Sequence, residues 1–255
     1  MKILVTNDDG VQAPGLLALA QEMRKLGKVT VFAPDKNWSA SGHVKTMERP
    51  LRVHETTLAD GSAAFASDGA PSDCVALPLL GLVEEQIDLV VSGINPNANL
   101  GHDVTYSGTV TAAMEAVIAG VNAIAVSLDS PDGHRGLLDY SCAAAIARRV
   151  AEKVITDGLP QGVVLNLNVP YLNENELKGF MITRQGLRVY RDALDQRLDP
   201  RGKPYYWIGG EAPTGVDEPG TDFGALRAGY VSITPLQLDL THYKAMDVLK
   251  KWEFQ

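Results

Sequence analysis

Two adjacent carboxylates follow the first apolar run of the chain. The run Ile3-Leu4-Val5 leads directly into Thr6-Asn7-Asp8-Asp9-Gly10. In an open parallel sheet, ligands bind beyond the carboxyl ends of the strands, and Asp8 and Asp9 are expected at such an end. Neighbouring acidic side chains repel each other unless a positive group neutralises them, which predicts a divalent cation bound by both. The alternative is a turn without a metal, because Asn, Asp and Gly also favour turns.

Two further oxygen donors are predicted at the same edge of the sheet. Ser39 lies in the loop after the predicted strand 29–33, and Asn95 follows the predicted strand 89–92. Gly10 permits a sharp turn, so both carboxylates can bend toward these residues. The donors are all oxygens, without a nearby His/Cys cluster, which favours Mg²⁺ or Mn²⁺ over zinc. We predict one cation per subunit, with Ca²⁺ as a further alternative, bound by Asp8, Asp9, Ser39 and Asn95.

The segment Ser107-Gly108-Thr109 precedes an apolar helical stretch. Small polar residues at a helix start expose backbone N–H groups and the positive end of the helix dipole, which together bind anions. Ser107, Gly108 and Thr109, together with Asn95, are therefore predicted to bind a substrate phosphate. The alternative is ordinary helix capping by Ser107 or Thr109.

The elements that must position these residues alternate along the first two thirds of the chain. Short apolar runs, suited to strands covered on both faces, alternate with helical stripes. This alternation predicts an α/β fold, a three-layer sandwich with a mainly parallel sheet. The predicted strands are 3–5, 29–33, 89–92, 123–127 and 163–167, and the clearest stripes are Leu16, Leu19, Ala20, Met23 and Leu26, then Cys142, Ile146, Val150 and Val154.

The last third of the chain differs in composition. Residues 186–220 are rich in Gly, Pro and charge and contain Tyr205-Tyr206-Trp207. We interpret this segment as a protruding hairpin arm, with strands at 187–190 and 205–208, whose aromatic side chains pack on another subunit. A flexible surface insertion is the alternative. Within a single domain covering 1–255, the segment 230–255 is predicted to return as a strand and a terminal helix.

Composition limits the partners and the compartment. The chain of 255 residues carries 23 basic and 31 acidic side chains, a formal charge of −8, and lacks a basic run that would track polymeric nucleic acid. No apolar stretch is long enough for a membrane span. The start is too short to be a signal peptide, and the two cysteines do not form a CxxC pair, so a cytoplasmic protein with free thiols is expected.

Other catalytic motifs are missing. The sequence contains neither GxxxxGK[ST] nor GxGxxG, which disfavours a Walker-type kinase or a dinucleotide enzyme. A metal site and a helix-start anion site in one fold predict phosphate-ester chemistry, to which two alternatives stay open. One is a metal-dependent nucleotide sensor without turnover, and the other is a serine hydrolase that uses Ser39 or Ser107.

Taken together, these motifs resemble the survival protein SurE family of metal-dependent 5'-nucleotidases. The resemblance rests on the following segments, which occur in the family's order along nearly the whole chain: Asn7-Asp8-Asp9-Gly10, the loop of Ser39, Asp68-Gly69-Ala70-Pro71-Ser72-Asp73, Ser92-Gly93-Ile94-Asn95, Tyr106-Ser107-Gly108-Thr109-Val110 and Gly229-Tyr230-Val231-Ser232-Ile233-Thr234-Pro235-Leu236. It implies a Rossmann-like core, an extended C-terminal part used in homodimers or homotetramers, and the metal ligands Asp8, Asp9, Ser39 and Asn95.

The sequence departs from this family at two positions. Asn97 and Thr111 stand where the family usually has glycine. Asn97 affects the loop beside the predicted metal site, because asparagine adopts left-handed backbone angles less freely than glycine. Thr111 narrows the space at the helix start. Neither position removes a predicted metal ligand.

The resemblance implies hydrolysis of nucleoside monophosphates, with 3'-nucleotides and polyphosphate as further substrates to test. We expect direct attack by water, since the DxDxT pattern of aspartyl phosphotransferases does not follow the first strand. Asp8 or Asp9 is expected to orient or deprotonate this water, and the spacing does not say which.

Overall fold

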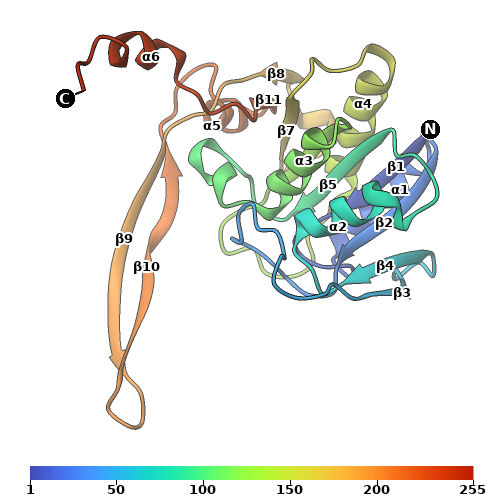
Figure 1. Ribbon diagram of the computed structural model, residues 1–255, viewed down its shortest axis with the longest axis horizontal. Helices are drawn as coiled ribbons and strands as arrows, with labels where there is room; N and C mark the ends of the chain where they lie inside the picture. Colours follow the sequence, from blue (N-terminus) through green and yellow to red (C-terminus); the bar gives the residue numbers. More distant parts are fainter. Residues whose placement is uncertain (255) are drawn as a thin grey trace.

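The centre of the molecule is a mixed sheet that is mainly parallel (Figure 1). The computed structural model describes residues 1–254, apart from the side chains of residues 192 and 211–213. Within this part of the chain the sheet has nine strands, in the order β3-β4-β2-β1-β5-β6-β7-β11-β8. They are β1 (Lys2–Thr6), β2 (Lys28–Pro34), β3 (Val53–Thr57), β4 (Ala63–Ser67), β5 (Leu89–Asn95), β6 (Asn122–Asp129), β7 (Val163–Pro170), β8 (Phe180–Ile182) and β11 (Val231–Gln237).

Helices cover both faces of the sheet, which confirms the predicted three-layer α/β sandwich. One layer holds α1 (Pro14–Met23) and α4 (Ser141–Asp157), and the other holds α2 (Pro71–Leu77) and α3 (Gly108–Ile118). Successive side chains of β1 pack on opposite faces of the sheet, as the two-residue period of a strand requires. Ile3 packs against the first helix layer and Leu4 against the second. This explains why the central strands read as continuous apolar runs.

The order of the strands places the predicted site at one edge of the sheet. Strand β1 lies in the middle of the sheet, parallel to β2 on one side and β5 on the other. The carboxyl ends of these three strands therefore meet at one edge, and the segments carrying the predicted ligands leave from there. The strand β11 runs antiparallel to β7 and closes the far side of the sheet together with β8.

Several elements differ from the prediction. The helix α1 begins at Pro14 and ends at Met23, so Leu26, the last residue of the predicted apolar stripe, lies beyond it. The strands β3 and β4 were not predicted. The exposed strand β3 has the sequence Val-His-Glu-Thr-Thr, which lacks the apolar run of a buried strand, because it lies at the edge of the sheet.

The segment 186–220 contains a long hairpin that extends away from the sheet (Figure 1). Its strands, β9 (Arg188–Leu198) and β10 (Pro204–Gly215), are longer than the predicted pair and are antiparallel. After it come the short helix α5 (Asp222–Arg227), the strand β11 and the terminal helix α6 (Tyr243–Leu249). Gln255, the end of the predicted segment 230–255, lies outside the described residues.

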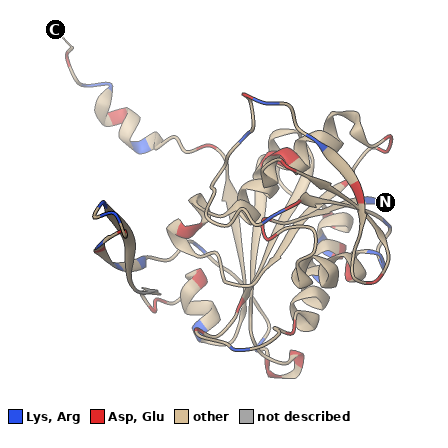
Figure 2. Cartoon of the chain, turned by 90° about the horizontal axis from the view of Figure 1, so that it is seen from below, with Lys and Arg blue, Asp and Glu red and all other residues tan. Residues whose placement is uncertain are grey.

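Charged residues are dispersed over the molecule. Figure 2 shows lysines and arginines interspersed with acidic residues rather than gathered on one face. Among the described residues, no helix is both long enough and apolar enough to cross a membrane.

Candidate active site

The turn after β1 is held by its own side chains. Asn7 is fully buried, and its amide donates to the Gly10 carbonyl (3.0 Å) and accepts from the Gly10 N–H (3.2 Å). Gly10 has φ +105°, and the backbone of Lys36 lies 3.3 Å from where its Cβ would be. The predicted turn is therefore present, and it carries Asp8 and Asp9 in a fixed arrangement.

Asp8 lies against the start of α3. Its side chain is buried, and the Thr109 hydroxyl donates to its carboxylate at 2.5 Å. The approach is so close that a Cβ added to Gly108 would lie 2.7 Å from Asp8 Cβ and 2.9 Å from Oδ2. Burial raises the pKa of Asp8, while the Thr109 hydroxyl and the backbone of Thr109 and Gly108 act in the opposite direction. The structure thus brings the acidic pair and the segment 107–109 together.

The side chains at the start of α3 are already engaged. The Ser107 hydroxyl accepts from the Val110 N–H at 3.1 Å, which is the capping arrangement considered from the sequence. The Thr109 hydroxyl donates to Asp8, so in this structure it orients a carboxylate. Ser107 can still donate its own hydroxyl proton to an anion. Phosphate binding by Ser107, Gly108 and Thr109 stays a prediction.

Asp9 is the freer carboxylate of the pair. Its strongest polar contact is with the Asn37 amide at 3.3 Å. Burial, and then the charge of Asp8, raise the pKa of Asp9 to about 7. Neither Asp8 nor Asp9 forms an ion pair with a basic side chain in the part of the chain that the structure describes. A divalent cation fits this pair, because it would neutralise one buried and one half-buried carboxylate that no described basic side chain compensates.

The metal-free protein is expected to lose stability as Asp9 ionises. Because its pKa is raised on folding, the folded state binds this proton more tightly, so stability falls as pH rises from about 4 to about 7. Asp9→Asn should remove this loss. In EDTA, the unfolding temperature measured by calorimetry should increase in the variant relative to the parent, and this increase should be larger at about pH 8 than at about pH 5. Each kcal/mol of stability corresponds to roughly 2–4 °C in the unfolding temperature. An equal difference at both pH values would contradict the prediction.

Asn95 ends β5, the strand next to β1 in the sheet. Thr6 of β1 pairs with Ser92 of β5, and Asp9 and Asn95 each follow that pair by three residues. The sequence predicted that Asn95 follows the strand in a loop, but Asn95 is the last residue of β5. The strand continues through an irregularity at Gly93, which has φ +143° and lies against the Val126 carbonyl. The Asn95 amide donates to the Asn97 carbonyl at 2.5 Å, which leaves its own carbonyl oxygen available to a cation.

Ser39 is exposed, in a loop that is fastened to the turn and to α3. The Trp38 N–H donates to the Asp8 carbonyl at 2.7 Å, directly before Ser39. Farther along, Glu115 of α3 accepts from Lys45 at 2.8 Å and contacts the His43 ring at 3.1 Å. The structure therefore places the Ser39 loop beside Asp8. Whether Ser39 binds the cation stays a prediction.

Thr111, which replaces a glycine usual in the resembling family, adds a third attachment. Its hydroxyl contacts the Gly42 carbonyl in the Ser39 loop at 3.1 Å and the Ser107 carbonyl at 2.8 Å. We expect Thr111→Ala to free this loop and weaken Mn²⁺ binding several-fold, since one hydrogen bond contributes about 1 kcal/mol. Thr111→Ser should keep the parental affinity, as measured by calorimetric titration. Equal affinities for the alanine and serine variants would contradict this role.

Sequence reasoning missed three residues near the carboxylates. These are Asn37 beside Asp9, Glu115 under the Ser39 loop, and Tyr140. Burial raises the pKa of Tyr140 to about 12, and the charge of Asp9 adds to the effect. Polar residues of this kind are common in loops, so no spacing signal marks them in one sequence.

The serine hydrolase alternative finds no support in the geometry. Neither the Ser39 nor the Ser107 hydroxyl bonds to a histidine in the described residues; Ser107 instead caps α3. The same residues contain no group of three or more His, Cys, Asp or Glu side chains that could hold a metal. A cation at Asp8 and Asp9 would therefore complete its coordination with neutral oxygens, such as those of Asn95, Ser39, water or substrate.

Comparison with known proteins identifies the family to which this chain belongs. The family model described as Survival protein SurE matches residues 3–192. The protein named 5'-nucleotidase SurE from Herpetosiphon aurantiacus is 55% identical over 95% of this chain and 94% of its own length, and that from Chloroflexus aggregans is 50% identical over the whole of both. A crystal structure of the SurE protein from Aquifex aeolicus aligns with a TM-score of 0.82 at 41% identity, covering 98% of each chain. The chain belongs to the survival protein SurE family.

Proposed function

We propose that this chain is a divalent-metal-dependent 5'-nucleotidase that hydrolyses nucleoside monophosphates to nucleoside and inorganic phosphate. The observation that carries the proposal is the position of the buried Asp8 carboxylate on the start of α3, beside Asp9. A pure anion-binding protein would gain nothing from two carboxylates beside its ligand. Relatives that are half identical over the full length are named 5'-nucleotidases, which supports the same assignment.

In this proposal the residues of the protein bind the substrate and take part in one proton transfer. A cation bound by Asp8, Asp9, Asn95 and Ser39 would stabilise negative charge on the phosphoryl oxygens. Ser107, Gly108 and Thr109 would hold the remaining oxygens through hydroxyl and N–H groups. Water attacks phosphorus, the bond from phosphorus to the nucleoside oxygen breaks, and that oxygen takes up a proton. Because Asp8 is held by Thr109, Asp9 is the better placed of the two to orient or deprotonate the water.

Phosphate release is the direct test. The protein is stripped with EDTA, reloaded with Mg²⁺, Mn²⁺ or Ca²⁺, and assayed with 5'- and 3'-nucleoside monophosphates and inorganic polyphosphate. We expect release from 5'-nucleotides with Mg²⁺ or Mn²⁺ and none in EDTA. Stoichiometric nucleotide binding without release would favour the sensor. Inhibition by serine-directed phosphonates, with full activity in EDTA, would favour the serine hydrolase.

We also propose that the arm, residues 186–220, joins copies of this chain into a homodimer or homotetramer. Its apolar side chains include Leu194, Trp207 and Ile208, which are 69%, 61% and 84% exposed. Replacing Trp207 and Ile208 by serine is expected to lower the mass measured by sedimentation, whereas Leu137→Ser, at an exposed position of the 130–140 loop, should not. An unchanged mass would show that the arm does not join the subunits.

Cys74 and Cys142 are free thiols, which supports a cytoplasmic location.

A further inference from the structure

A large cavity lies beside the candidate active site. Its volume is about 690 Å³, within the range of small-molecule sites. It spans the ends of β6 and β7, the base of the hairpin and the helix α5. Its walls include Asn97, Asp129, Arg188, Thr214, Phe223 and Arg227.

Asn97 connects this cavity to the predicted metal site. Its carbonyl accepts from the Asn95 amide at 2.5 Å, and its own side chain lines the cavity. Asn95 pairs with Ser127 of β6, and Asp129 follows two residues farther along that strand. One wall of the cavity therefore lies at the carboxyl ends of β5 and β6, the edge of the sheet that carries Asn95.

The cavity offers a hydrogen-bond acceptor that no described residue uses. The half-buried Asp129 carboxylate forms no hydrogen bond or ion pair with any described residue, and burial raises its pKa although Arg188 and Arg227 oppose this. The Arg188 guanidinium is held by Asp103 at 2.8 Å and lies 6.0 Å from the centre of the Phe223 ring. A partly desolvated carboxylate binds neutral hydroxyl donors well. The Phe223 ring, in contrast, already packs against Gly215, where an added Cβ would lie 2.5 Å from it.

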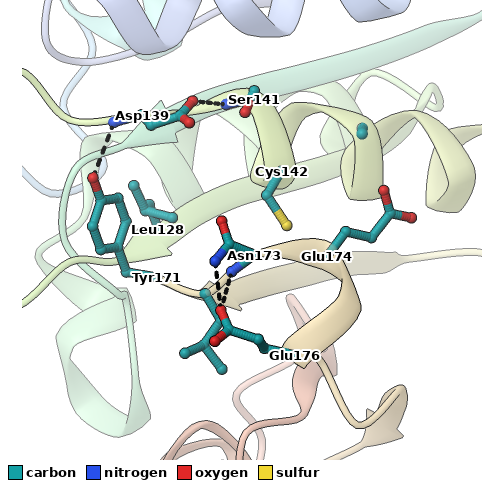
Figure 3. Close-up of a pocket in the computed structure, with 10 residues that line it drawn as sticks. Leu128, Asp139, Ser141, Cys142, Tyr171, Asn173, Glu174 and Glu176 are labelled. Carbon is teal, nitrogen blue, oxygen red and sulfur yellow. Dashed lines mark hydrogen bonds between the residues drawn. The ribbon is translucent and has the colours of Figure 1, made fainter.

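A smaller cavity provides a contrast. It has a volume of about 470 Å³ and lies between the start of α4 and the segment after β7 (Figure 3). Its acidic side chains already have partners. Asp139 accepts from the Ser141 N–H at 2.8 Å, and Glu176 accepts from the Asn173 backbone and side chain. Of the two, the larger cavity therefore has the free acceptor that a ligand needs.

We propose that the larger cavity binds the nucleoside part of the substrate, with Asp129 accepting hydrogen bonds from the ribose hydroxyls. This inference rests on the proposed function, because it takes the phosphate of the same molecule to lie at the acidic pair. It predicts that ribonucleosides bind better than 2'-deoxynucleosides through Asp129, which lies outside the predicted metal and phosphate ligands.

Binding of free nucleosides tests this without requiring turnover. Adenosine, guanosine, cytidine and uridine, with their 2'-deoxy counterparts, are titrated calorimetrically into the full-length protein. We expect at least one ribonucleoside to bind and its 2'-deoxy form to bind more weakly. Asp129→Asn should weaken the ribonucleoside about 10-fold or more, since hydrogen bonds to charged groups are the stronger ones. The matched control Asp157→Asn, at the exposed end of α4, should leave it unchanged.

A second variant fills the cavity. Thr214 is exposed on the hairpin side of the wall, and Thr214→Trp should reduce kcat/KM for the nucleoside monophosphate about 10-fold. Both Thr214→Trp and Asp129→Asn should leave kcat/KM for p-nitrophenyl phosphate, which has no nucleoside, at the parental value. An equal loss on both substrates would overturn the proposal, because it would indicate a general structural effect.

Two further results would overturn the inference: no nucleoside binding to the parent protein, or binding that Asp129→Asn and Thr214→Trp leave unchanged. Failure of the proposed function looks different. In that case the metal-loaded parent releases phosphate from neither substrate, while the calorimetric titrations still decide whether the cavity binds ribonucleosides.

Discussion

Asp8→Asn lowers kcat for nucleoside monophosphate hydrolysis by at least ~100-fold, even at saturating Mn²⁺. The amide has nearly the shape of the carboxylate and can still accept from the Thr109 hydroxyl, so the fold should persist. It lacks the negative charge, however, and a carboxylate that holds the cation is expected to contribute several kcal/mol of transition-state stabilisation.

The assay is phosphate release over a Mn²⁺ titration, with calorimetric unfolding as the check on folding. Asp157→Asn, which makes the same change on the surface, is the control and should keep parental kcat. Asp9→Asn is expected to behave like Asp8→Asn in this assay. Parental turnover in either site variant at saturating Mn²⁺ would show that the carboxylate has no such role.

Gly108→Ala is expected to lower kcat by about 100-fold through a single methyl group. The new Cβ would lie 2.7 Å from Asp8 Cβ, so Asp8 must move away from the start of α3. Displacing a catalytic group by about 1 Å costs roughly this much activity. The helix itself should tolerate the change, because alanine favours helices more than glycine does.

The measurement is again phosphate release, compared with Gly209→Ala. That control adds the same methyl group to the exposed hairpin, where its nearest contact would be the Ala193 carbonyl at 3.9 Å. Unfolding temperatures should stay close to the parent for both variants. If Gly108→Ala retained full activity, then the contact between Asp8 and α3 would not matter for catalysis.

The sequence predicts the buried strands of this fold better than its edges. The runs at 3–5, 29–33 and 89–92 are apolar because both faces of the sheet are covered, so pattern alone finds β1, β2 and β5. At the edge, β3 carries His54 and Glu55 toward solvent and gives no such pattern. The end of α1 is also not marked in the sequence, because the residues after Met23 still favour a helix although α1 ends there.

The site was predictable as a set of positions but not as a set of contacts. Adjacent carboxylates at a strand end point to a cation wherever they occur. The contact between Asp8 and Gly108 joins residues one hundred positions apart and depends on how closely α3 packs on the turn. The same holds for Glu115, whose partners Lys45 and His43 lie in a loop that sequence periodicity does not describe.

The hairpin enters and leaves the domain at one place. Arg188 pairs with Gly215 at its base, and the chain on either side continues to β8 and β11, which are neighbours in the sheet. Extra or missing residues at the tip would therefore change only the reach of the hairpin, without altering the spacing of its two anchoring strands. The length of the hairpin can thus change while the sheet that carries Asp8 and Asp9 keeps one architecture.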